Sequence, residues 1–161
     1  MPDSFLRTTE TSRIVEQRVR MGQHRFARQV LENFGHTCVF CGFAPRHLHG
    51  RGLMLASHIK PWRDSDNRER LDPANGLAAC PVHDKAFDSG LLMVNGGLRI
   101  HRSASLVQSI GSDERSSDYF GEGSLAHSLI LVEGALPPNG RYLDYHREHV
   151  FERHVVSGVS V

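Results

Sequence analysis

Two aspartates in the middle of the chain have the residue type and spacing of ligands for a divalent cation. Asp84 and Asp88 are four residues apart, and residues four apart project from one face of a helix. Pro81 suits the first turn of such a helix, and Gly90 suits the position beyond its end. Two hard oxygen ligands on one face favour Mg²⁺ or Mn²⁺. Such a pair is more often solvated surface, so it indicates a metal site only together with other groups.

A histidine and an asparagine are predicted at the ends of two strands that precede this helix. The stretch Leu53–Ile59 is typical of a strand that closes at His58 and is stopped by Pro61, and residues 75–79 are typical of a returning strand that opens with Asn75. A histidine at a strand end can deprotonate a water beside a bound cation. Metal-assisted hydrolysis of a phosphodiester needs such a base, a cation and fixed geometry.

The three cysteines point to metal or redox chemistry rather than to a disulfide framework. Their number is odd, and two of them form the motif Cys38-x-x-Cys41. We favour the metal interpretation, because no thioredoxin-like strand pattern surrounds the motif. The N-terminus lacks the apolar stretch of a secretory signal, and no apolar run approaches ~18 residues. The expected location is cytoplasmic.

Length and composition predict one globular domain, and the helices and strands expected along it give an α+β fold. The 161 residues are 39% hydrophobic and 23% charged, which is typical of a globular protein with a single core. We expect loose tails at residues 1–12 and 155–161 around a domain at residues 13–154. The further elements expected are a helix at 13–33, a hairpin at 91–100 around Asn95-Gly96, a short strand at 129–132 and a closing helix at 142–154. No prediction is made for residues 102–123.

The ordered set of motifs resembles the HNH endonucleases with the ββα-metal fold, and more closely the bacterial predicted restriction endonucleases of that superfamily. The core of the resemblance is Ala56-Ser57-His58-Ile59-Lys60-Pro61-Trp62, then Asn75-Gly76-Leu77, then His83-Asp84-Lys85-Ala86-Phe87-Asp88-Ser89-Gly90-Leu91. The flanks Arg20-x-Gly22-Gln23-x-x-Phe26 and Tyr142-Leu143-x-Tyr145-His146-Arg147-Glu148-x-Val150-Phe151 also resemble the group. The resemblance covers residues 13–153.

The resemblance implies a role for each residue of the core. His58 would be the general base, and Asn75 would hydrogen-bond across the hairpin to hold the loop of His58. Asp84 and Asp88 stand nine and thirteen residues after Asn75, where the family has its catalytic metal ligands. The residue before the base is often an acidic or histidine ligand in the family. Here it is Ser57, whose hydroxyl is a poor ligand.

The resemblance also implies a structural zinc site made by two knuckles. Cys38-x-x-Cys41 would pair with Cys80-x-x-His83 to give a tetrahedral Cys₃His set. Adjacent helical residues point about 100° apart, so His83 is assigned to zinc and its neighbour Asp84 to the catalytic ion. Two alternatives remain open: His83 serves as the catalytic ligand, or one of His36, His47 and His49 replaces it at zinc. Surface or structural roles are expected for His101, His127, His146, His149 and His154.

Arginine dominates the positive charge and favours contact with nucleic-acid phosphates. The net charge is only +1, and Lys60 and Lys85 are the only lysines, a bias that a GC-rich genome would also produce. Arginine binds phosphate in a bidentate manner. In the expected fold, loops on both sides of the His58 strand would border the phosphate path, and they carry Arg46, Arg51, Arg63, Arg68 and Arg70. Nearby acidic residues partly offset this charge.

The leading hypothesis from the sequence is a metal-dependent DNA endonuclease in a restriction or defence setting. It would use structural Zn²⁺ and catalytic Mg²⁺ or Mn²⁺, and DNA would be its partner. Three alternatives remain: a zinc-stabilised DNA-binding module without catalysis, which the serine at position 57 favours; an RNase or toxin effector; and a redox or zinc-storage protein. A homodimer or a separate specificity partner is compatible with the sequence.

Overall fold

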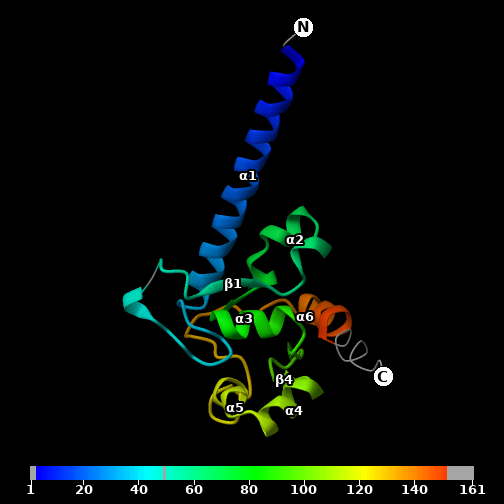
Figure 1. The fold of residues 1–161 in the computed structure, drawn as a ribbon. Coiled ribbons are helices and arrows are strands. Elements are labelled where there is room, and N and C mark those ends of the chain that lie inside the picture. The colour runs from blue at the N-terminus through cyan, green and yellow to red at the C-terminus, as the bar shows by residue number, and fades with distance from the viewer. Residues whose placement is uncertain (1–2, 49, 152–161) are drawn as a thin grey trace, which may run out of the picture.

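The protein has a mixed helix and sheet architecture built around a short ββα unit (Figure 1). A computed structural model describes residues 3–48 and 50–151. In the unit, strand β1 (Leu55–His58) pairs antiparallel with strand β2 (Gly76–Ala79), and helix α3 (Pro81–Asp88) follows at once. The register sets His58 opposite Gly76. The predicted α+β fold with a ββα core is therefore confirmed.

Strand β2 is buried along its whole length because helices pack on the two-stranded sheet. Helix α1 (Asp3–Asn33) contributes Phe26 and Val30, and Phe34 follows directly after it; the three recur every four residues and are at most 2% exposed. Gly76 permits the close approach: a Cβ added there would lie 2.4 Å from a Val30 methyl carbon. The sequence therefore places its smallest residue where a helix crosses the sheet.

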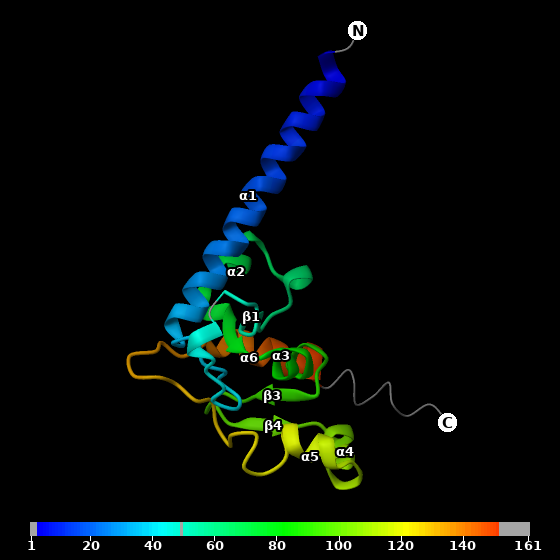
Figure 2. The same cartoon turned by 60° about the vertical axis from the view of Figure 1, so that its left-hand side comes forward.

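Helix α1 is longer than the sequence predicted, and its first half projects from the body of the molecule (Figures 1 and 2). It begins at Asp3 rather than near residue 13, so residues 3–12 extend the helix instead of forming the expected loose tail. Gly35 ends it as expected, with a positive φ of 58°. No described helix combines the length and the hydrophobicity that a membrane crossing requires.

The connection from β1 to β2 is a chain of short, well-capped turns. It contains η2 (Trp62–Asp64), helix α2 (Asn67–Leu71) and η3 (Pro73–Asn75). Asp66 and Glu69 form a reciprocal capping box at the start of α2, which satisfies two otherwise free backbone donors. This charged segment is therefore an ordered structure that holds the end of β1.

The predicted hairpin at residues 91–100 is present as β3 (Leu92–Val94) paired with β4 (Ile100–Arg102). It leads into two short helices, α4 (Ala104–Ser112) and α5 (Glu114–Phe120), which fill the segment left without a prediction. Their N-caps are Ser103 and Asp113, whose side chains accept backbone hydrogen bonds.

Two expectations about the C-terminal third need correction. Residues 129–132 form no strand, because the Leu129 N–H donates to the Leu98 carbonyl and the Ile130 N–H to the Val39 carbonyl, so the segment bridges two different elements. The closing helix is divided into α6 (Gly140–His146) and the π-helical turn η4 (Arg147–Phe151). Its expected end at residue 154, and the tail 155–161, lie outside the described residues.

Candidate active site and metal centre

A cleft of about 1190 Å³ opens beside β1 and collects the residues predicted to perform chemistry. It is lined from helix α1, strand β1, the η2 turn, helix α3 and the C-terminal elements α6 and η4. His58, Asp84 and Asp88 all line it, together with Ser57. The structure thus brings the candidate base and both candidate carboxylate ligands to one concave surface.

His58 is held between aromatic side chains in a defined orientation. Its ring stacks on Phe26 with centroids 4.0 Å apart, and the ring of Trp62 meets it edge-on at 5.6 Å. Its Nε2 lies 3.0 Å from the Arg70 carbonyl oxygen. A carbonyl only accepts, so Nε2 carries the hydrogen and Nδ1 keeps a free lone pair. Burial lowers the pKa of His58 below 6.5 and keeps the ring neutral near pH 7.

Asn75 ties the end of β1 to the loop that carries Arg70. It is fully buried, and its Oδ1 accepts a hydrogen bond of 2.8 Å from the Lys60 backbone N–H. Its Nδ2 donates to the Glu69 carbonyl at 3.0 Å, while its own carbonyl accepts from the Ile59 N–H at 3.0 Å. These bonds hold both the backbone that follows His58 and the backbone that precedes the carbonyl on its Nε2.

Asp84 and Asp88 form a carboxylate pair that is short of positive charge. Ser57 Oγ donates to Asp88 Oδ1 at 3.3 Å. Desolvation within the cleft, followed by the charge of Asp84, raises the pKa of Asp88 to about 6, although part of the side chain is exposed. Burial likewise raises the pKa of Asp84. Two carboxylates that repel each other and resist ionisation fit a hard divalent cation, which would offset both charges.

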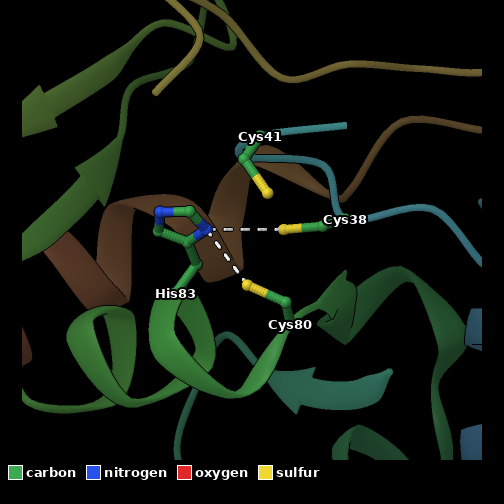
Figure 3. Close-up of side chains that lie close together, drawn as sticks. All are labelled: Cys38, Cys41, Cys80 and His83. Atoms are coloured by element: carbon green, nitrogen blue, oxygen red, sulfur yellow. Dashed lines mark hydrogen bonds between the residues drawn. The ribbon is translucent and has the colours of Figure 1, made fainter. Parts of the chain in front are cut away.

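Three cysteines and one histidine converge in the interior, and Figure 3 shows their four side chains pointing toward one another. The ligand atoms of Cys38, Cys41, Cys80 and His83 all lie within 4.8 Å of one another. His83 Nδ1 lies 3.2 Å from Cys80 Sγ and 3.7 Å from Cys38 Sγ. Its Nε2 lies 2.9 Å from the Tyr119 carbonyl oxygen, so Nε2 carries the hydrogen and Nδ1 presents its lone pair to the sulfurs.

This Cys₃His cluster fits a structural zinc ion by its donor chemistry. Thiolates and a neutral imidazole are the ligands of closed tetrahedral zinc sites. Among the described residues, no other set of three or more such groups gathers in this way. His36 and His47 lie outside the cluster, and His49 falls outside the described residues.

The knuckle that carries the first two cysteines is fixed to the ββα unit. The Cys38 N–H donates to the Phe43 carbonyl, the Gly42 N–H donates to the Cys38 carbonyl, and each bond is 2.8 Å long. Gly42 adopts a positive φ of 78°, which glycine tolerates best. The Val39 N–H then donates to the Ala78 carbonyl of β2 at 2.9 Å. A metal in the cluster would therefore connect the knuckle, strand β2 and helix α3.

Comparison with known families agrees with this geometry. Residues 38–95 match a family model described as HNH endonuclease, and this segment contains the Cys₃His cluster, His58, Asn75 and the aspartate pair. Residues 38–95 are therefore similar to the HNH endonuclease family. The resemblance inferred from the motifs is thus confirmed for this segment.

A comparison with solved structures also finds similarity. A chain titled "Modification dependent TagI restriction endonuclease" is 18% identical, with 77% of this chain and 36% of that chain covered and a TM-score of 0.49. The protein therefore spans little more than a third of that chain's length. No curated protein sequence gives a significant match.

The five predicted phosphate-binding arginines occupy different sides of the HNH domain. Arg63 lines the cleft, and Arg70 lies beside it, with its guanidinium 4.7 Å from the centroid of the Trp62 ring. Arg68 is exposed on helix α2. Arg46 and Arg51 are exposed in the loop between the knuckle and β1, which Figure 1 shows at the other end of that strand. The structure brings Arg63 and Arg70 to His58, and it does not bring the other three.

The sequence assigned no role in the cleft to several of the residues that form it. Phe26 and Trp62 orient His58, yet Phe26 is 32 positions away in the chain. His146 and His149 also line the cleft. His146 is buried, stacks on Phe87 and hydrogen-bonds with its carbonyl at 2.9 Å. The expected structural role of His146 agrees with these contacts, whereas only the fold reveals the position of His149 in the cleft.

Proposed function

We propose that the protein is a divalent-metal-dependent HNH endonuclease that hydrolyses phosphodiester bonds in DNA and serves in restriction or defence. The observation that carries this proposal is the convergence of His58, with a free Nδ1, and the Asp84–Asp88 pair in one cleft. This combination supplies a base and a cation site on the same surface, which hydrolysis of a phosphodiester requires.

In the proposed reaction, His58 Nδ1 accepts a proton from a water molecule, and the water oxygen forms a bond to phosphorus. The bond from phosphorus to the leaving oxygen breaks in line, and that oxygen takes a proton from solvent. The Arg70 carbonyl stabilises the imidazolium, because it accepts the hydrogen on Nε2. Asn75 is a positioning residue that holds the backbone on both sides of this contact.

Asp84 and Asp88 would hold the catalytic Mg²⁺ or Mn²⁺. When bound, such an ion stabilises the negative charge that develops on the phosphoryl group. Ser57, which stands where the family often has a ligand, donates its hydroxyl to Asp88 and would orient that carboxylate. Cys38, Cys41, Cys80 and His83 would hold Zn²⁺ as a structural ion, away from solvent and from the cleft. Arg63 and Arg70 are the arginines best placed for phosphate contact.

The first prediction tests the base. His58→Ala is expected to lower Mg²⁺- or Mn²⁺-dependent nicking of plasmid DNA by roughly 10²-fold or more, the scale of a lost general base. DNA binding and zinc content should stay unchanged. His127→Ala, which removes an exposed histidine outside the cleft, is the matched control and should cut normally.

Parallel substrates separate the alternatives. A protein that binds DNA but cuts nothing with either ion would be the non-catalytic module, and near-normal cutting by His58→Ala would remove the base assignment. Preferential cutting of RNA would favour the RNase or toxin effector. Modified and unmodified plasmids, each digested with Mg²⁺, Mn²⁺ or EDTA, would define the substrate within the DNA class.

A further inference from the structure

Helix α1 presents an outward face that is rich in arginine and is covered by nothing in the described structure. Its core side carries Phe26 and Val30. At about 100° per residue, the opposite half of the helix carries exposed arginines at positions 13, 18, 20, 25 and 28. Glu10 and Glu32 lie on the same half of the helix, and Glu16 lies at its edge, between Arg13 and Arg20 in the sequence. Arginines therefore outnumber acidic residues on the outward face of α1.

Two of these arginines continue the wall of the cleft along the helix. Gln23 and Ala27 line the cleft. Arg20 and Arg13 lie seven and fourteen residues before Ala27, and seven residues are almost two helical turns, so all three fall on one edge of α1. At ~1.5 Å per residue, Arg20 stands about 10 Å and Arg13 about 20 Å beyond Ala27. A polyanion that leaves the cleft along α1 would meet them in turn.

These arginines have no anionic partner in the part of the chain that is described. Among the ion pairs of residues 10–48 and 50–151, none involves an arginine of α1. By contrast, Arg115, Arg141 and Arg147 each lie within 4.0 Å of a carboxylate. Like charges repeated along one helix face repel each other, and an external anion would relieve that repulsion.

We propose that the outward face of α1 is an arm that binds the phosphate backbone of duplex DNA outside the cut site. This inference rests on the proposed function, because it takes the duplex engaged by the cleft as the occupant of the arm. Arg13 and Arg20 are its principal contacts, and Arg18, Arg25 and Arg28 add charge. The arm reads no bases, so it increases affinity for any sequence and anchors the duplex in the cleft.

Charge complementarity favours DNA over a second copy of the chain. The exposed apolar residues of this half of α1 are divided between two sides of the helix. Ile14 and Met21 lie among the arginines, whereas Val15 and Val19 lie toward the core side. They therefore form no single seam for helix pairing, and two copies packed through this face would bring arginine against arginine.

The test compares binding and cutting by Arg13→Gln/Arg20→Gln with those of the parent protein. Fluorescence anisotropy on a duplex of about 40 base pairs, in EDTA and over a range of salt concentrations, should show about tenfold weaker binding. The slope of log K against log salt should become shallower by about 2, because each lost phosphate contact contributes roughly 0.9. In cleavage assays KM should rise while kcat at saturating DNA stays unchanged.

Two further variants control the test. Arg99→Gln/Arg115→Gln removes the same charge from exposed sites on the far side of the molecule and should leave the salt slope unchanged. Arg13→Lys/Arg20→Lys should keep most of the affinity. An unchanged slope in the glutamine variant, an equal loss in the far-side control, or a dimer in sedimentation that the glutamine variant breaks apart would each overturn the arm. If the parent protein cuts no DNA, yet the glutamine variant still shows the shallower salt slope, the proposed function alone would be overturned.

Discussion

At the scale of single residues, the pKa values of His58 and Asp88, on two sides of the cleft, are shifted in opposite directions. Burial lowers the pKa of His58 and raises that of Asp88, so the base favours its neutral form while the carboxylate resists ionisation. Both shifts have the same origin, because desolvation disfavours whichever form is charged. The base is therefore ready to accept a proton near pH 7, whereas the carboxylate gains most from a nearby cation.

The raised pKa of Asp88 predicts that the stability of the protein changes with pH. Its pKa is about 6 in the folded protein against an ordinary value of 3.8, so its ionisation lowers stability above pH 6 and costs nothing below about 3.8. Without divalent ions, Asp88→Asn should raise the melting temperature by a few degrees at pH 8, and the gain should shrink toward zero at pH 4. Calorimetry at both values, with Asp118→Asn as the exposed control, measures this.

A gain of equal size at both pH values would show that the carboxylate carries no such penalty. The same variant is expected to lose metal-stimulated cleavage and to keep its zinc.

At the scale of elements, the crossing of helix α1 over strand β2 positions His58, the proposed base. A Cβ at Gly76 would meet Val30 Cγ2 at 2.4 Å and Phe26 Cζ at 2.8 Å. Gly76→Ala should therefore push α1 off the sheet and cost roughly 1–3 kcal/mol of stability. Because Phe26 stacks on His58, cleavage should fall as well. Denaturant unfolding and nicking assays test this.

Gly96→Ala is the matched control, since nothing lies within 4 Å of a Cβ at that turn. Wild-type stability in Gly76→Ala would show that α1 shifts on the sheet without cost.

Local spacing predicted β1, β2, α3 and the β3–β4 hairpin because each is defined by residues close in sequence. Helices α4 and α5 escaped prediction since their segment is rich in serine and their N-caps resemble loop residues. The apolar run at 129–132 was misread as a strand because its hydrogen bonds reach Leu98 and Val39 separately. The motifs supplied the polar residues of the cleft, whereas its aromatic frame depends on contacts between distant segments.

At the scale of the whole molecule, the Cys₃His cluster brings together two pairs of residues that are distant in the sequence, Cys38 and Cys41 with Cys80 and His83. A bound ion would connect the knuckle, β2 and α3, and the free energy of binding would add directly to that of folding. Purified protein should contain about one tightly held zinc per chain. Cys80→Ser and His83→Ala should lose zinc and melt early, while Asp84→Ala should keep both zinc and stability. Elemental analysis and thermal melts separate these outcomes.

His83→Ala that keeps zinc and stability yet cuts no DNA would instead make His83 the catalytic ligand, the alternative left open by the sequence.

Because His83 and Asp84 are adjacent on helix α3, the effect of a chelator would depend on the duration of the treatment. The ligands on one side of the helix are buried, at 0% exposure for Cys38 and 3% for His83, while Asp88 on the other side is open to solvent. A brief chelator pulse would strip only the accessible ion, and added Mg²⁺ would restore cutting at once. Prolonged exposure would also extract the enclosed ion and release the helix that carries Asp84, so the same addition would no longer restore activity.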